Sequence, residues 1–295
     1  MALHLLCGGK DLNHSKDEII AWYEMKTESI LRKYGPGPRV HFHTGIMDSE
    51  TKPASSVEEI RLQLVRSQER LLQEAARLWE ADKNLTGDVL DVGCGLGGAS
   101  IYFAQVYGAN VHALTNVPGH IPLIAKFVKQ VEVADRVKPI LGDACSVPGE
   151  KVYDAAVAIE SSCYLDRSAW FQHLDKRVRK GGRVFIVDCF TENDEIREPF
   201  DAYWFTRIGA LAEYVSSSEL ANFRIEGLKD LTSETANFWR LSTDYSKLIL
   251  ETHTTSQRES VRLQRSIRWQ TRLANMWYSG MLQCALLSLT HLDTK

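Results

Sequence analysis

The chain has 295 residues, of which 44% are hydrophobic and 25% are charged. This composition is typical of a soluble globular protein and excludes a disordered or fibrous chain. The formal net charge is −3 and no long basic run occurs, so nothing indicates a nucleic-acid partner. Six cysteines without a C-x-x-C pair indicate neither zinc nor a small disulfide framework. Free thiols in a reducing cytoplasm are the simplest interpretation, so we expect a cytoplasmic protein.

The hydrophobic residues give no sign of export or of a membrane. The chain begins MALHLLCGG, which has no basic segment ahead of its apolar stretch, so we expect no export signal. No window approaches the length of about 18 uninterrupted apolar residues that a spanning helix needs. We therefore expect no membrane partner.

Two helices are predicted in the first part of the chain. Residues 17–34 place apolar side chains at helical spacing, and the GPGP sequence at 35–38 ends the pattern. A second helical pattern covers about 56–81. We expect residues 1–84 to form a helical N-terminal cap on the rest of the protein.

The rest of the chain, 85–295, alternates short apolar runs with helical patterns. The runs predict strands at 88–92, 110–115, 137–141, 153–159 and 183–189. Residues 225–231 and 281–292 are two further strand candidates, and the long helical stretch at 233–275 is expected to cover a substrate. Continuous apolar strands separated by helices predict an α/β fold with a mostly parallel, seven-stranded sheet covered on both faces.

A glycine-rich loop, VLDVGCGLGG, runs from the first predicted strand into a helix. Residues without Cβ let a ligand approach the backbone, and the following helix directs N–H groups at it. A dinucleotide site would read G-x-G-x-x-G and have an acid at the end of the second strand. Here the third glycine comes early and Asp91 stands two residues before Gly93, which disfavours a nicotinamide dehydrogenase.

The D-V-G-C-G sequence resembles the first motif of the class I S-adenosylmethionine (SAM) dependent methyltransferases, over about residues 85–190. The resemblance implies a Rossmann-like α/β fold with SAM as cofactor and S-adenosylhomocysteine as product. Asp91, Gly93, Cys94 and Gly95 would hold the methionine end of SAM.

Two later strand ends carry the other parts of this cofactor pattern. The second strand ends in Thr115 and Asn116 where most of the family has an acid for the ribose, and an asparagine can still hydrogen-bond a diol. The third strand ends in Asp143 and Ala144, which the resemblance assigns to adenine. It also implies cofactor contacts from Tyr23, Tyr34, His43, Gly45, His120 and Glu160.

Glu160 lies in the segment A-I-E-S-S-C-Y-L-D after the fourth strand. This segment resembles one in the geranyl diphosphate C-methyltransferases, where the glutamate lies in the active site. Methylating an alkene produces a carbocation, which a carboxylate can stabilise or deprotonate. The alternative is a strand-end glutamate that contacts SAM only through its backbone.

Aromatic residues are expected around the same site. Tyr203 and Trp204 follow the fifth strand in a predicted lid, and Trp239 lies in S-E-T-A-N-F-W-R, which resembles the T-P-E-T-L-P-Y-W segment of the same enzymes. Aromatic faces can stabilise a cation, although such residues also serve as ordinary packing. The predicted catalytic residues are Glu160, Tyr203, Trp204 and Trp239.

The segment from Tyr34 to Ile46, Y-G-P-G-P-R-V-H-F-H-T-G-I, resembles the teleocidin-type C-methyltransferases. Those enzymes act on a prenylated indole alkaloid, and methylation triggers terpenoid cyclisation. His41 and His43 have no third ligand in the sequence, so no metal site is expected. Arg39 is a single candidate cation for a diphosphate and no DDxxD-type cluster occurs, which favours a neutral terpenoid.

Together these patterns predict C-methylation of the terpenoid side chain of a small natural product, followed by migration, cyclisation and deprotonation of the cation. Three alternatives stay open. One is magnesium-dependent C-methylation of a prenyl diphosphate. Another is O- or N-methylation of a small aromatic molecule with His41, His43 or His120 as base. The third is a SAM-binding protein without turnover. The apolar N-terminal helix predicts a homo-oligomer.

Overall fold

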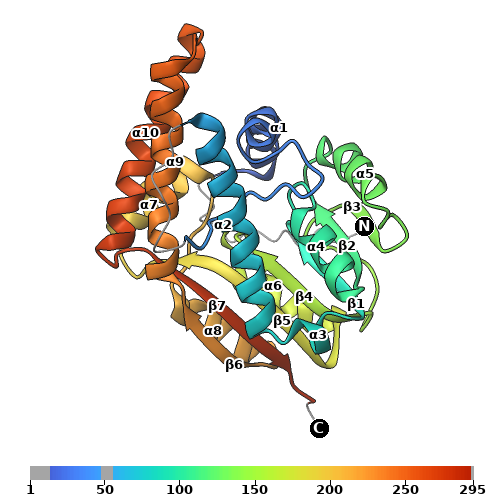
Figure 1. Cartoon of the computed structure of the whole chain (residues 1–295). Helices are drawn as coiled ribbons and strands as arrows, with labels where there is room; N and C mark the ends of the chain where they lie inside the picture. The colour runs from blue at the N-terminus through green and yellow to red at the C-terminus, as the bar shows by residue number, and fades with distance from the viewer. Residues whose placement is uncertain (1–13, 48–55, 294–295) are drawn as a thin grey trace.

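A computed structural model of the chain describes residues 14–47 and 56–293 (Figure 1). Residues 1–13, at the start of the predicted N-terminal cap, lie outside these ranges. Seven strands form one sheet in the order β3-β2-β1-β4-β5-β7-β6. Neighbours from β3 to β5 are parallel, whereas β7 runs antiparallel to both β5 and β6. The predicted mostly parallel seven-stranded sheet is therefore confirmed.

The first four strands begin and end at the predicted residues. They are β1 (Asp88–Val92), β2 (Asn110–Thr115), β3 (Val137–Leu141) and β4 (Tyr153–Ile159). The other three are β5 (Val178–Phe190), β6 (Phe223–Asp230) and β7 (Gln283–His291). Short apolar runs between glycine and polar turns form central strands such as β1 and β4, which are buried on both sides, whereas the edge strands β3 and β6 are partly exposed.

Helices cover both faces of this sheet. Val89 points into a core shared with α2 (Val57–Leu78) and α4 (Gly98–Tyr107), whereas Leu90 points into a core shared with α6 (Arg167–Arg177) and α8 (Leu211–Leu220). Successive strand side chains alternate between the two layers, as the pleat requires. The helices α3 (Ala81–Asn84) and α5 (His120–Gln130) also belong to this part of the fold.

Four helices lie over the carboxyl edge of the sheet or beside it. They are α1 (Lys16–Tyr34), α7 (Asp194–Trp204), α9 (Thr232–Thr252) and α10 (Gln257–Tyr278). The predicted single helical stretch at 233–275 is two antiparallel helices, α9 and α10, which pack on each other, while α9 also packs on α2 (Figure 1). The division into a cap at 1–84 and a core at 85–295 stays a prediction.

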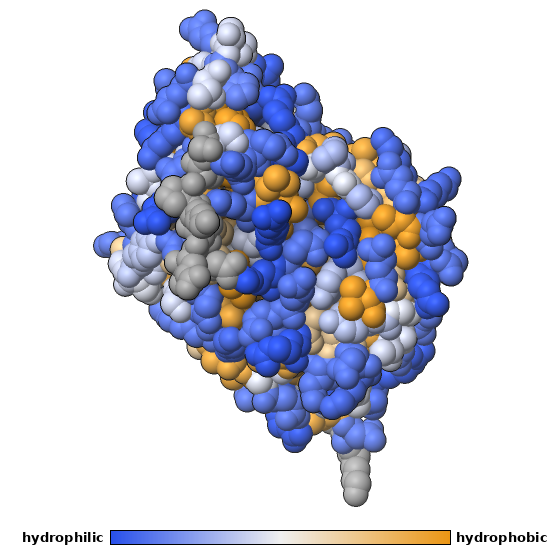
Figure 2. Space-filling view, in the orientation of Figure 1, coloured by the Kyte–Doolittle hydropathy of each residue, from blue (hydrophilic) through white to orange (hydrophobic). Residues whose placement is uncertain are grey.

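The apolar side of α1 faces inward. Ser15 caps the helix through the Glu18 backbone N–H, and Ile19, Trp22 and Ile30 are buried in the same molecule. These contacts account for the apolar pattern from which we predicted an oligomer, so the homo-oligomer stays a prediction without that support. Hydrophilic side chains dominate the face in Figure 2, with the hydrophobic ones in small groups. Within the described ranges, every helix is too short or too polar to cross a bilayer.

Candidate active site

The glycine loop leaves β1 at the carboxyl edge of the sheet and enters α4. The Cys94 N–H donates to the Leu114 carbonyl at 2.9 Å, which ties the loop to β2. Gly93 has a φ of +69° and Gly95 a φ of +56°, a region that side chains disfavour. A Cβ on Gly93 would lie 2.6 Å from the Ser161 Cβ, whereas a Cβ on Gly95 would meet nothing within 4 Å. The loop therefore exposes its backbone to open space at Gly95.

A cavity lies in front of this loop, and we call it the strand-end cavity because the ends of β1 to β4 form its floor. Its lining includes most of the predicted cofactor residues: Tyr23, His43, Asp91, Gly93, Cys94, Gly95, Thr115, Asn116, His120, Asp143, Ala144 and Glu160. Parallel strands all end at one sheet edge, so residues from distant parts of the sequence meet there.

Two carboxylates of the strand-end cavity differ in their partners. Asp91 is buried and accepts a hydrogen bond from the Ser100 hydroxyl at 2.5 Å, and burial raises its pKa to about 6. Asp143 is more open: its Oδ1 accepts from the Cys145 N–H at 2.8 Å, and its Oδ2 lies 2.6 Å from the Lys16 Nζ. The first turn of α1 thus closes one end of the cavity through Lys16.

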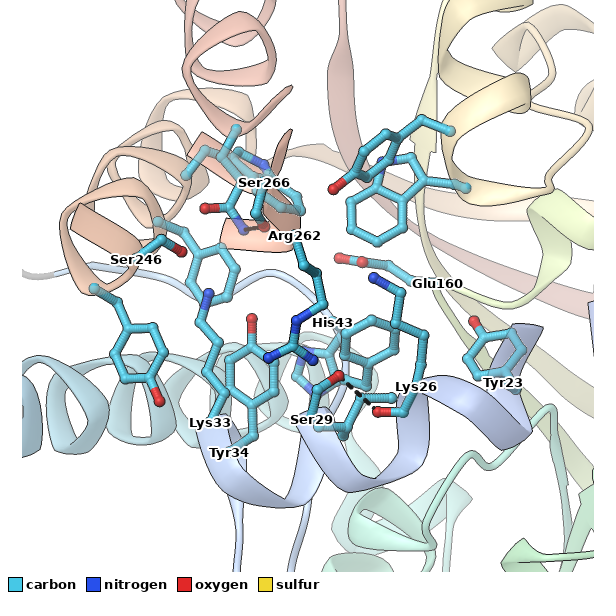
Figure 3. A pocket seen from close by; sticks show the side chains of 18 of the residues that line it. Tyr23, Lys26, Ser29, Lys33, Tyr34, His43, Glu160, Ser246, Arg262 and Ser266 are labelled. Atoms are coloured by element: carbon cyan, nitrogen blue, oxygen red, sulfur yellow. Dashed lines mark hydrogen bonds between the residues drawn. The ribbon is translucent and has the colours of Figure 1, made fainter. Parts of the chain in front are cut away.

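A second cavity, the cap cavity, lies between α1, α7, α9 and α10 (Figure 3). Its wall is rich in aromatic side chains, namely Tyr23, Tyr34, Phe42, Tyr164, Phe200, Tyr203, Trp204, Phe238, Trp239 and Tyr245. Tyr203 is held by stacking on Trp269, with ring centroids 4.5 Å apart, and the Trp204 and Trp239 rings lie 5.9 Å apart. The predicted catalytic aromatics therefore share one cavity.

The two cavities meet at a small set of residues. Both are lined by Tyr23, Ile30, Phe42, His43, Glu160 and Tyr164. The Tyr23 and Tyr164 hydroxyls are 2.8 Å apart and hydrogen-bonded to each other. These shared residues therefore place the two cavities side by side, and we call this boundary the junction.

Glu160 is the acidic residue at the junction. Its φ of +47° is unusual for a residue with a side chain and turns the carboxylate away from the regular course of β4. The Oε1 atom accepts from the Thr44 N–H at 2.7 Å and from the Thr44 hydroxyl. Burial raises the pKa of Glu160 to about 7, and the Thr44 hydrogen bonds partly oppose this rise. The carboxylate is therefore poised to exchange a proton near neutral pH.

His43 lines both cavities together with Glu160, but its pKa is shifted in the opposite direction. Its Nδ1 is 2.6 Å from the Thr44 carbonyl and so carries the proton, while its buried Nε2 has no partner. Burial, with His41 nearby, lowers the pKa of His43 to about 3. This imidazole is therefore neutral at physiological pH, and its buried Nε2 has no hydrogen-bond partner among the described residues.

Several predicted residues lie elsewhere. Gly45 lines neither cavity, because it packs against α2, where a Cβ would lie 2.2 Å from the Ser67 hydroxyl. Tyr34 lines the cap cavity and not the strand-end cavity. Arg39 lines neither, and its Nε lies 3.0 Å from Glu69. In the part of the chain that the structure describes, no group of three metal-binding side chains occurs.

The sequence analysis missed three residues of the cap cavity and Thr44, the hydrogen-bond partner of Glu160, which lines neither cavity. Thr44 escaped notice because its two hydrogen bonds to Glu160 join positions 116 residues apart. Lys26 and Lys33 line the cap cavity and are seven positions apart on α1, a spacing that places them on one helix face. Arg262 joins them from α10. The spacing of the two lysines was a signal available in the sequence.

The chain is similar in sequence to known methyltransferases. Residues 89–182 match the family described as "Methyltransferase domain". Over 214 residues the chain is 27% identical to a probable tocopherol O-methyltransferase of rice, covering 68% of this chain and 58% of that protein. It is also 27% identical over 164 residues to a geranyl diphosphate 2-C-methyltransferase of Streptomyces lasalocidi, covering 52% of this chain and 54% of the relative. The chain thus spans little more than half of either relative.

Two solved structures have the same fold. A geranyl diphosphate methyltransferase, solved in complex with GPP and sinefungin, superposes with a TM-score of 0.76 at 18% identity, covering 94% of this chain and 98% of that one. The [4+2]-cyclase SpnF superposes with a TM-score of 0.74 at 19% identity, covering 97% of this chain and 100% of that one. The described fold is that of the class I methyltransferases.

Proposed function

We propose that this chain, which contains a SAM-dependent methyltransferase domain, methylates an alkene carbon of a terpenoid side chain on a small natural product. The observation that carries the proposal is the junction at Glu160, a residue that lines both the glycine-loop cavity and the aromatic cavity. The geranyl diphosphate 2-C-methyltransferase relative supports the carbon acceptor. A prenylated indole alkaloid is the substrate type that the N-terminal segment favours.

The residues that line the strand-end cavity are chemically suited to binding SAM. The open space at Gly95 leaves the loop backbone free for the methionine end, with the buried Asp91 carboxylate below it. Asn116 would bind the ribose hydroxyls, and Asp143 with Ala144 would bind adenine. When bound, SAM supplies an electrophilic methyl group carried on a sulfonium.

The residues of the junction would perform the remaining chemistry. The aromatic wall of the cap cavity would orient the alkene and exclude water, since alignment alone supplies a large part of such catalysis. The new carbon–carbon bond leaves a carbocation on the substrate, which the faces of Trp204 and Trp239 would stabilise. After any migration or ring closure, the Glu160 carboxylate would take the proton whose loss restores an alkene.

O-methylation is a second candidate, because the neutral His43 lines both cavities and its Nε2 has no hydrogen-bond partner among the described residues. The tocopherol O-methyltransferase relative is consistent with it. A pKa of about 3 makes His43 a weak base, whereas the pKa of about 7 for Glu160 suits proton removal at neutral pH. This difference favours Glu160 over His43 as the base.

The test is to incubate the protein with methyl-deuterated SAM and either a geranylated indole lactam or geranyl diphosphate with Mg²⁺, and to identify products by mass spectrometry. A labelled methyl and an added ring on the lactam would support the proposal. A labelled diphosphate would move the function to the magnesium-dependent alternative. If neither is labelled while an aromatic hydroxyl is, O-methylation replaces the proposal.

Glu160→Gln sharpens the same test. It should leave SAM affinity unchanged and lower turnover by about 100-fold or more, since that is the usual contribution of a general base. The matched control is Glu150→Gln, an exposed glutamate outside both cavities. Turnover of Glu160→Gln within about twofold of the wild type would remove Glu160 from the mechanism.

A further inference from the structure

The cap cavity has a cationic side that the aromatic residues do not explain. Lys26 and Lys33 come from one face of α1, and Arg262 comes from α10. Figure 3 shows the three side chains extending toward the middle of the cavity. Glu160 reaches the same cavity from the end of β4. A purely apolar substrate would give these cations nothing to bind.

Both lysines lack an acidic partner. Within residues 14–47 and 56–293, no carboxylate lies within ion-pair distance of either ammonium group. The Lys33 Nζ donates to the Ser242 hydroxyl and lies 5.2 Å from the ring centre of Tyr34, while the Lys26 Nζ lies 5.2 Å from the ring centre of Trp22. Hydroxyl groups and ring faces compensate a buried charge less well than a carboxylate does.

Arg262 has only a weak share of its acidic partner. It is 3.4 Å from Glu259, and the same carboxylate oxygen lies 2.5 Å from Arg32, which also pairs with Glu28 at 3.1 Å. The Arg262 side chain is 42% exposed, so it can bind an incoming group and also neutralise it before it enters the cavity.

The pKa values of the two lysines reflect their burial without a carboxylate partner among the described residues. Burial lowers the pKa of Lys33 to about 7, and Lys26 adds to the effect. Burial also lowers the pKa of Lys26, with Arg262 and Arg265 contributing. A bound anion would reverse these shifts, because an opposite charge favours the protonated amine.

We propose that Lys26, Lys33 and Arg262 form a metal-independent subsite for an oxyanionic end group, a carboxylate or a phosphate, of the substrate. The inference rests on the proposed function and adds to it that the substrate is amphipathic. Its anionic end lies between α1 and α10, and its hydrocarbon part lies along the aromatic wall toward the junction. This reverses the expectation of a neutral substrate, which depended on Arg39 being the single available cation.

The test measures binding, so that it does not depend on turnover. Geranyl monophosphate, geranic acid and geraniol share one hydrocarbon chain and differ only in the end group. Each is titrated calorimetrically into the SAM-loaded protein in buffer that contains EDTA. Both anions should bind about tenfold or more tightly than the alcohol, because hydrogen bonds to charged groups are the strong ones. The two anions separate a carboxylate subsite from a phosphate subsite.

Lys33→Met should abolish this preference for anions while leaving geraniol affinity within about twofold. Arg262→Glu, at the exposed mouth, should weaken anion binding without disturbing the buried part of the fold. The matched controls are Lys247→Met and Arg268→Met, which lie on α9 and α10 outside the cavity and should retain the preference.

Two results would overturn the subsite. Equal affinity of the wild type for the alcohol and both anions would show that the cations bind no end group. Anion binding that appears only when Mg²⁺ replaces EDTA would show that a metal is required. If the anions bind tightly but no substrate is methylated, the subsite stands and the proposed function fails. If geraniol is the only compound that is bound and methylated, the proposed function stands and the subsite fails.

Discussion

The two cavities that meet at Glu160 are built in different ways. The strand-end cavity is lined mainly by backbone turns and short side chains at the ends of four adjacent strands, so its shape follows from the sheet. The cap cavity is lined mainly by long side chains from α1, α7, α9 and α10. Exchanging those side chains would change what the cavity accepts without disturbing the sheet. The contrast explains how one fold can keep a cofactor and vary its substrate.

The largest expected effect tests the strand-end cavity. Gly95→Asp should lower SAM affinity by more than about 100-fold, because the new side chain fills the space that the methionine end would occupy. Gly280→Asp is the matched control, since Gly280 has a φ of +71° and also leaves nothing within 4 Å of a new Cβ. Both variants have the same backbone strain, so their melting temperatures should fall alike. Calorimetric SAM affinity that is equal in the two variants would refute the position of the cofactor.

The next effect tests the junction between the cavities. Thr44→Val removes the hydroxyl donor to the Glu160 carboxylate and should raise the pKa of Glu160 above about 7. The base is active when deprotonated, so the rate should rise with pH through about 7 in the wild type and at higher pH in the variant. At pH 7 the variant should lose about fivefold in turnover, because a rise of about one pKa unit lowers the deprotonated fraction from about one half to about one tenth.

Thr44→Ser is the control for that prediction. It keeps a hydroxyl and should restore the wild-type pH profile. Thr44 is a positioning residue in this scheme, so a purely structural role would lower the rate equally at all pH values. An unshifted profile in Thr44→Val would therefore separate Thr44 from the proton transfer.

A smaller effect tests the aromatic wall of the cap cavity. Trp204→Leu removes one ring near the expected position of the cation and should lower turnover by about threefold to thirtyfold, the range expected of a cation–π contact. SAM affinity should not change, because Trp204 lines only the cap cavity. Trp204→Phe should retain most of the activity, as measured by steady-state kinetics. Equal losses in both variants would indicate packing and not charge stabilisation.

The sequence alone predicted the strand-end cavity better than the cap cavity, for a physical reason. Buried parallel strands leave continuous apolar runs, and Asp91, Asn116 and Asp143 lie directly at the ends of such runs. The limits of β1 to β4 followed from this pattern. Gly45 was predicted beside the cofactor and packs against Ser67 on α2, because a loop glycine gives the same sequence pattern whether it approaches a ligand or another helix.

The cap cavity needed the tertiary structure. Lys26 and Arg262 line the same cavity because of the way α1 and α10 cross. The helical pattern of neither segment encodes that crossing. The break between α9 and α10 was missed because residues 253–256 are polar without being glycine or proline. Glu160 was found as a candidate, but its partner Thr44 lies on a loop whose path the sequence does not define.

The smallest expected effect concerns Asp143, at the far end of the strand-end cavity. Its Oδ1 is already occupied by the Cys145 N–H and its Oδ2 by Lys16, so an adenine amino group would have to share an oxygen. Asp143→Ala should therefore lower SAM affinity by only about twofold to tenfold, the range of a single hydrogen bond. Lys16→Met, which frees Oδ2, should leave affinity unchanged or raise it slightly, as measured by calorimetry. If Lys16→Met instead lowers affinity as much as Asp143→Ala, the ion pair itself closes the cavity, and α1 contributes to cofactor binding as well as to the cap cavity.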